Sequence, residues 1–166
     1  LCDRKDGQEM EFVSRNPGWR EERRRVLALP SYTKGEEIAN AITHGLGVAL
    51  AAVGAVVLMM HAPGDALSLA SAGVYSLTMF LLYLVSTLYH SLEVCKAKKI
   101  FQVLDHCTIY LLIAGTYTPI SLLCIGGQTG WLLAGIVWTA GVIGIVLNAI
   151  NMKKFRVVSM ICYLAM

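Results

Sequence analysis

Four long, nearly uncharged apolar runs dominate this chain and determine the solvent in which it folds. They extend over residues 38–60, 67–90, 101–125 and 131–150. About 20 residues of helix, at a rise of ~1.5 Å each, cross the ~30 Å hydrocarbon core of a bilayer. Hydrophobic residues make up 56% of the 166 residues and charged residues 15%, a balance far more apolar than that of a soluble domain. The runs therefore predict an all-α, multi-pass transmembrane helix bundle.

The segments between the runs predict turns, and the last segment predicts an incomplete span. Pro63-Gly64 separates the first two runs, and the glycine-rich segment 126–130 separates the last two. Apolar residues resume at Val157 and continue for ten residues to the end, which is about half of a bilayer crossing. The chain also opens on Leu1. We therefore expect four full spans and the start of a fifth, in a chain that is cut at both ends.

Basic residues predict the orientation of the spans. Loops 91–100 and 151–156 are rich in lysine and arginine, whereas the alternating segments 61–65 and 126–130 contain neither residue. Positively charged loops favour the cytoplasmic side of a membrane. We therefore expect a multi-pass protein of the cell membrane with a cytoplasmic amino terminus.

The charged residues of the amino terminus predict a separate arm. We place the boundary between a basic cytoplasmic arm, residues 1–35, and an incomplete transmembrane domain, residues 36–166. The arginines at positions 23–25 either contact anionic lipid headgroups or belong to a solvated tail that only fixes topology. The expected partners are membrane lipids, with no nucleic acid, and the oligomeric state stays open.

Polar residues occur at the predicted cytoplasmic ends of the second and third spans. Ser86 and His90 are four residues apart, which places them on one helix face. Asp105 and His106 lie in the first turns of the next span, after a loop short enough to make the two helices antiparallel neighbours. Ionisable groups in a membrane segment cost free energy and usually have a function. We therefore expect Ser86, His90 and Asp105 to converge just inside the cytoplasmic boundary.

The first span brings a second polar stripe to the same depth. Glu37, Asn40 and His44 follow an i, i+3, i+7 spacing and so share one helix face. Imidazole ligates metals, carboxylate orients or deprotonates water, and a hydroxyl hydrogen-bonds to either. Taken singly, His90 is better explained as an interfacial residue that reaches for water. Asp105 alone could cap the third helix, and Glu36 and Glu37 could cap the first. The coincidence of several such residues at one depth favours a metal or proton site.

Three sequence motifs resemble the bacterial hemolysin III family. They are Glu36–Gly45, Ser86–Ser91, and Leu104–His106 followed by Ile109–Pro119. This family is the prokaryotic branch of the progestin and adiponectin receptor group, within a membrane-hydrolase superfamily that includes the alkaline ceramidases. The resemblance covers roughly residues 35–166, and three motifs in the right order make it specific.

The resemblance implies a seven-helix parent, from which this chain is truncated, with a zinc ion near the inner membrane face. His90 matches the family's zinc-ligand histidine of the second span, and Ser86 and Asp105 match its serine and third-span aspartate. The other two zinc ligands belong to an HxxxH pattern in the seventh span, which lies outside this sequence. We therefore expect zinc in the full-length protein and an incomplete zinc site in this chain.

The matched residues also suggest a reaction. Zinc held by three histidines activates water to attack a carbonyl. Asp105 would hydrogen-bond to that water or deprotonate it, and Ser86 would orient His90, the water or a developing oxyanion. The expected function is the zinc-dependent hydrolysis of lipid amides or esters at the cytoplasmic membrane face.

Two other functional classes compete with the hydrolase. A pore-forming cytolysin would assemble as an oligomer, for which Gly141–Gly144 and residues 126–130 offer weak close-packing signals. A receptor or regulator of membrane state would change conformation without turnover. None of the four spans carries a polar stripe along its whole length, which argues against the pore.

Overall fold

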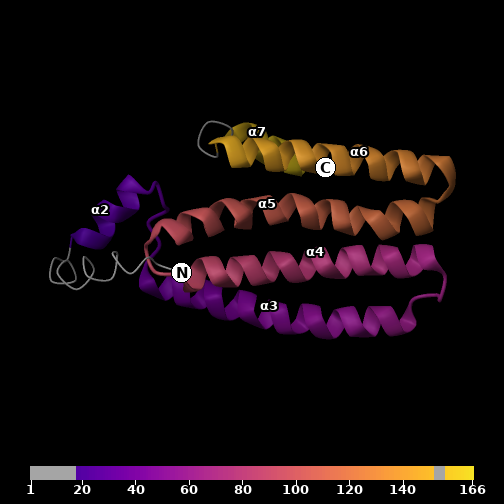
Figure 1. Ribbon diagram of the computed structural model, residues 1–166, viewed down its shortest axis with the longest axis horizontal. Coiled ribbons are helices and arrows are strands. Elements are labelled where there is room, and N and C mark those ends of the chain that lie inside the picture. The colour runs from indigo at the N-terminus through magenta and orange to yellow at the C-terminus, as the bar shows by residue number, and fades with distance from the viewer. Residues whose placement is uncertain (1–17, 152–155) are drawn as a thin grey trace.

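Helices account for almost all of the residues that the structure describes. The structure is a computed structural model that describes residues 18–151 and 156–166. The elements in chain order are α2 (Trp19–Val26), α3 (Lys34–His61), α4 (Ala66–Ser91), α5 (Lys96–Pro119), the π-helical segment η1 (Ile120–Ile125), α6 (Gly127–Asn151) and α7 (Arg156–Ala165) (Figure 1). No strand occurs within the two described ranges, and the predicted all-α fold is confirmed.

Four helical segments are long and apolar enough to cross a membrane. Within the described ranges they are Lys34–His61, Ala66–Ser91, Lys96–Ile125 and Gly127–Ile150. The four predicted spans are therefore confirmed, and each helix begins one to five residues before its predicted start. The apolar segment predicted from Val157 is helical as α7.

The four long helices form an antiparallel array in chain order. α3 packs on α4, α4 on α5, and α5 on α6, while α7 folds back against α6 and also touches α5 (Figure 1). The short helix α2 lies at the end of the array where α3 begins, α4 ends and α5 begins (Figure 1). Segments that are distant in sequence therefore meet at this end.

Local signals explain where α3 and α4 begin. The Thr33 hydroxyl accepts the Glu36 N–H at 3.3 Å, and the Glu36 carboxylate accepts the Thr33 N–H at 2.7 Å, which together form a capping box. Asp65 follows Pro63-Gly64 and accepts the Ser68 N–H at 2.9 Å as the N-cap of α4. That hydrogen bond holds the pKa of the Asp65 carboxyl below its usual value.

The end of the third span departs from regular α-helix. Pro119 ends α5 and the six residues that follow form the wider π-helical turns of η1. Proline has no N–H to donate and crowds the preceding turn, so it interrupts the regular ladder. Gly126 and Gly127 then adopt φ angles of 64° and 58°, which side chains rarely tolerate. These glycines make the turn into α6.

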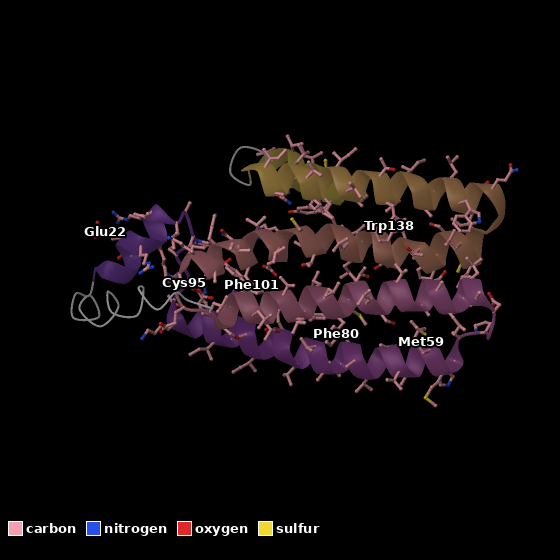
Figure 2. The ribbon with its side chains drawn as sticks, viewed as in Figure 1. Glu22, Met59, Phe80, Cys95, Phe101 and Trp138 are labelled. Atoms are coloured by element: carbon pink, nitrogen blue, oxygen red, sulfur yellow. The ribbon has the colours of Figure 1, made fainter. Side chains whose placement is uncertain are left out.

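Glycines and hydroxyl side chains bring the helices close together. Gly115 of α5 lies against Thr78 of α4, and Gly144 of α6 lies against the Tyr110 ring of α5. Trp138 lies between α6 and α5 (Figure 2), where its Nε1–H donates to Thr118 Oγ1 at 3.1 Å. Small residues at such crossings are typical of helix packing in membranes. Gly144 thus packs inside the chain and gives no signal for an oligomer.

The outer face of the array is apolar. On α3 the exposed side chains at positions 42, 46, 50, 53 and 57 are isoleucine, leucine and valine, and Leu50 is 72% exposed. Their spacing of three or four residues forms one continuous stripe along the helix. Such a surface is unfavourable in water and matches the solvent properties of lipid.

We expect Gly115→Ala to destabilise the fold. The added Cβ would collide with Thr78, whose hydroxyl is fixed by hydrogen bonds to the carbonyls of Val74 and Tyr75. Overpacking of this kind costs about 1–3 kcal/mol. Gly54→Ala is the matched control, because a Cβ there meets no atom within 4 Å. Thermal unfolding in detergent would measure both variants, and equal melting temperatures would contradict the tight α4–α5 crossing.

Candidate functional site

A buried cluster of charged side chains lies where α3 begins, α4 ends and α5 begins. Glu37 comes from the first turn of α3, His90 from the last turn of α4 and Lys98 from the first turn of α5. Their exposed fractions are 8%, 9% and 3%. Three helices therefore place ionisable groups out of contact with bulk water.

Glu37 is the centre of this cluster. Its Oε2 lies 3.0 Å from His90 Nδ1, and its Oε1 lies 2.9 Å from Lys98 Nζ. Arg24 of α2 reaches the same Oε1 with Nη2 at 3.4 Å. A buried carboxylate needs such partners, because an unpaired charge in a low-dielectric interior is strongly unfavourable.

The two cationic partners of Glu37 are themselves held in place. Lys98 Nζ donates to the Leu92 carbonyl at 2.9 Å and lies 5.1 Å from the centre of the Tyr89 ring, a distance at which a cation and a π-face attract. Arg24 Nη1 donates to the Pro30 carbonyl at 2.8 Å. The loop between α4 and α5 and the segment before α3 are thus both tied to this cluster.

Aromatic rings surround His90. The ring centres of Tyr89, Tyr32 and His44 lie 4.6, 5.7 and 5.9 Å from that of His90. His44 also contacts Tyr83 edge-on, with ring centres 6.0 Å apart. The Nδ1 atom of His44 is buried, and no described residue forms a hydrogen bond with it.

The polar residues singled out in the first three spans have different surroundings. Glu37, His44 and His90 come together. Ser86 is buried one turn before His90, but no hydrogen bond joins the two within the described chain. Asp105 and Asn40 are half-buried, and their side chains form no hydrogen bond or ion pair with described residues.

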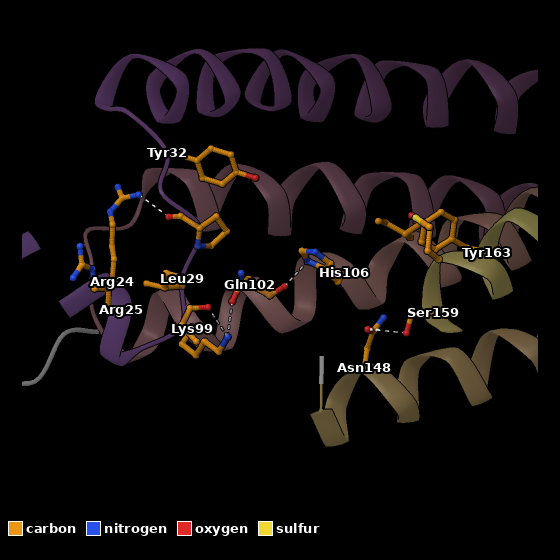
Figure 3. Close-up of a pocket in the computed structure, with 14 residues that line it drawn as sticks. Arg24, Arg25, Leu29, Tyr32, Lys99, Gln102, His106, Asn148, Ser159 and Tyr163 are labelled. Atoms are coloured by element: carbon orange, nitrogen blue, oxygen red, sulfur yellow. Dashed lines mark hydrogen bonds between the residues drawn. The ribbon is translucent and has the colours of Figure 1, made fainter. Parts of the chain in front are cut away.

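His106 lies at a cavity that adjoins the charged cluster, because Arg24 and Tyr32 contact both. Its Nδ1 is 2.9 Å from the Gln102 carbonyl oxygen, and its ring faces a cavity of about 690 Å³ between the α2–α3 segment, α5, α6 and α7 (Figure 3). Arg24, Arg25 and Lys99 line one end of this cavity. Neighbouring positions on a helix point about 100° apart, which is why Asp105 and His106 do not share a surface.

Sequence reasoning missed Lys98 and Arg24 as partners of Glu37. Both residues are positively charged and lie near predicted span ends, so their role in setting topology already explains why they occur there. The available signal is that a carboxylate in the first turn of a membrane span needs a nearby cation. Several lysines and arginines meet this condition, so only the three-dimensional packing selects Lys98 and Arg24.

The described residues contain no complete metal site, and His90 is the candidate ligand among them. No group of three or more histidine, cysteine, aspartate or glutamate side chains within the described ranges could hold a metal ion. His90 directs Nδ1 to Glu37, and its Nε2 forms no hydrogen bond with described residues. The nitrogen that zinc would need is therefore available, and His90 fits the role of one ligand among several.

The four apolar spans, their exposed aliphatic surface and the polar cluster at one end define a multi-pass helical membrane protein. The family model described as "Haemolysin-III related" matches residues 32–166. The chain belongs to this family, and the resemblance inferred from the sequence motifs is confirmed.

Individual relatives support the same assignment. The chain is 47% identical over 133 residues to Hemolysin-3 of Bacillus cereus, covering 79% of this chain and 61% of that protein. It is 44% identical over 137 residues to the Hemolysin-3 homolog of Bacillus subtilis (strain 168), covering 81% and 64%. A more distant similarity, 26% over 136 residues, links it to the human monocyte to macrophage differentiation factor, covering 79% and 57%. The chain thus spans less than two thirds of the curated relatives it matches, and no solved structure matches it.

We expect Lys98→Met to destabilise the protein strongly. The substitution keeps an unbranched side chain but removes a buried cation from Glu37, and breaking a buried ion pair costs about 3 kcal/mol. Lys96→Met is the matched control, because Lys96 is exposed at the start of the same helix. Unfolding in detergent would compare the two, and equal stability would contradict the structural role of the Lys98–Glu37 pair.

Proposed function

We propose that this chain is part of a zinc-dependent membrane hydrolase that cleaves lipid amides or esters at the cytoplasmic face of the cell membrane. The observation that carries the proposal is the burial and hydrogen bonding of His90. Its ring is buried in the last turn of a membrane helix, with Nδ1 on the carboxylate of Glu37. A histidine that gives one nitrogen to a carboxylate and keeps the other available is typical of protein metal sites.

His90 would hold zinc together with ligands from outside this sequence. The family resemblance suggests two such histidines in a later span. When bound, zinc would supply Lewis acidity that polarises a carbonyl group and makes water a stronger acid. The side chains of this chain that would take part in the reaction are Asp105 and Ser86.

Asp105 and Ser86 are the proposed reacting and stabilising groups. The Asp105 carboxylate is half-buried and not engaged by any described residue, so it is available to accept a proton from water as a general base. Ser86 is buried on α4 one turn before His90, and its hydroxyl can donate to an oxyanion that develops on the substrate carbonyl.

The flanks of the site suit a lipid substrate. Ile38 and Ile42 are exposed on α3, one and five residues after Glu37, and Ile100 and Leu104 are exposed on α5. These side chains give the site an apolar rim at the membrane boundary, where an acyl chain can lie while its polar linkage reaches the buried groups. The arginines of α2 and the lysines near the start of α5 lie at this same end (Figure 1), which supports a cytoplasmic location.

A lytic function is the second candidate, because two of the relatives carry the name hemolysin. A pore needs a polar path through the bilayer, whereas the outer stripe of α3 is apolar along its length. Gly144, which could have supported assembly with other copies, is covered by Tyr110 within the chain. These features favour the hydrolase.

The test uses the full-length protein purified in detergent. We expect about one zinc per chain, lost in His90→Ala and retained in Asp105→Asn, when metal content is measured by elemental mass spectrometry. Hydrolysis of a panel of lipid amides and esters should fall about 10²–10⁴-fold in Asp105→Asn. His61→Ala is the matched control, since His61 is exposed at the opposite end of α3. A clean wild-type protein without zinc, or with zinc unchanged in His90→Ala, would overturn the proposal.

A further inference from the structure

The hydrogen bond between His90 and Glu37 determines which nitrogen of His90 carries the proton. An ionised carboxylate can only accept hydrogen bonds, so the contact of 3.0 Å between Nδ1 and Oε2 requires a hydrogen on Nδ1. In a neutral imidazole the other nitrogen then presents a lone pair. Glu37 thus selects the tautomer in which Nε2 can bind a metal.

The remaining contacts of Glu37 leave it poorly placed to bind a metal itself. Its Oε1 is occupied by Lys98 Nζ and, at a longer distance, by Arg24 Nη2. Both cations are anchored by backbone carbonyls, Arg24 by that of Pro30 and Lys98 by that of Leu92. The carboxylate is therefore held from two sides, and only Oε2 is directed at His90. Because both oxygens are engaged, Glu37 itself is poorly placed to become a metal ligand.

The packing around His90 fixes the plane of its ring. Tyr89 lies against the ring, and Tyr32 approaches it edge-on. A ring flip that exchanged the two nitrogens would remove the donor from Glu37 and leave a buried carboxylate oxygen without its partner, which is costly. The aromatic contacts and the carboxylate therefore favour the same single ring orientation.

We infer that Glu37 is a positioning residue that orients His90 and fixes its tautomer for metal binding through Nε2, with Lys98 and Arg24 holding the carboxylate in place. This inference rests on the proposed zinc-dependent function and assigns a role within that site. Glu37 acts only through His90 and touches neither metal nor substrate. Loss of such a carboxylate partner weakens metal binding about 10–100-fold in known sites.

The experiment compares variants of the full-length protein by zinc competition with a chromophoric chelator. We expect Glu37→Gln to weaken zinc binding about 10–100-fold, because an amide can donate as well as accept and no longer selects one tautomer. Glu36→Gln is the matched control, since the Glu36 carboxylate faces solvent and caps Thr33. Lys98→Met controls for lost stability, because it removes one partner of the carboxylate but leaves Glu37 beside His90, and it should weaken zinc binding less than Glu37→Gln does.

A second readout is independent of zinc. Nitrogen-15 NMR of the metal-free wild-type protein, with the His90 signals assigned by their loss in His90→Ala, should show a protonated Nδ1 and an unprotonated Nε2. In Glu37→Gln we expect a mixture of tautomers. The opposite tautomer in the wild type would overturn the inference even where a variant does not fold.

The outcomes separate this inference from the proposed function. Zinc that is lost in His90→Ala but bound normally in Glu37→Gln would overturn the positioning role alone. Equal weakening in Lys98→Met and Glu37→Gln would also overturn it, because general destabilisation would then account for the loss. Zinc retained in His90→Ala would overturn the proposed function together with this inference.

Discussion

The packing at one end of this protein depends on a single buried carboxylate. Glu37 lies in a helix that faces lipid, where an isolated negative charge would be strongly unfavourable. The charge is tolerated because His90, Lys98 and Arg24 meet it from three other segments. The same interactions that compensate the charge therefore connect α2, α3, α4 and α5. Membrane helices lack a hydrophobic force that pulls them together, so a polar contact of this kind has a large share in fixing their arrangement.

Away from this cluster, the described helices are held together by close van der Waals contacts and not by charged groups. Gly115 and Gly144 leave room for Thr78 and Tyr110 of neighbouring helices, and hydroxyl groups return their hydrogen bonds to backbone carbonyls of their own helix. Every backbone group in a lipid environment must be satisfied within the protein. The long spans meet this requirement by remaining helical, including the wider turns of η1 after Pro119.

The sequence predicts the spans well and the site only in part. The apolar runs, bounded by Pro63-Gly64 and by the glycines near 126, indicate where the helices begin and end. They do so because the thickness of the bilayer sets the length of each span. Periodicity also places Glu37 and His44 on one face of α3. It does not specify how far one helix slides or turns against another. The pairing of Glu37 with Lys98, and the orientation of His106 toward the cavity between α5, α6 and α7, therefore follow from the packing alone. The π-helical segment has no signal beyond Pro119.

The turn between η1 and α6 has a consequence for the register of the last span. A single residue, Gly126, joins the end of η1 to the start of α6. Its N–H donates to the Ser121 carbonyl, and its own carbonyl accepts the Gly130 N–H. A connection of one residue cannot accommodate an inserted residue without shifting the helix that follows. An insertion there would rotate α6 by about 100° about its axis, which would move Gly144 away from the Tyr110 ring and present a bulkier side chain to it. The length of this turn thus sets the rotational register of α6 against α5 along their whole contact.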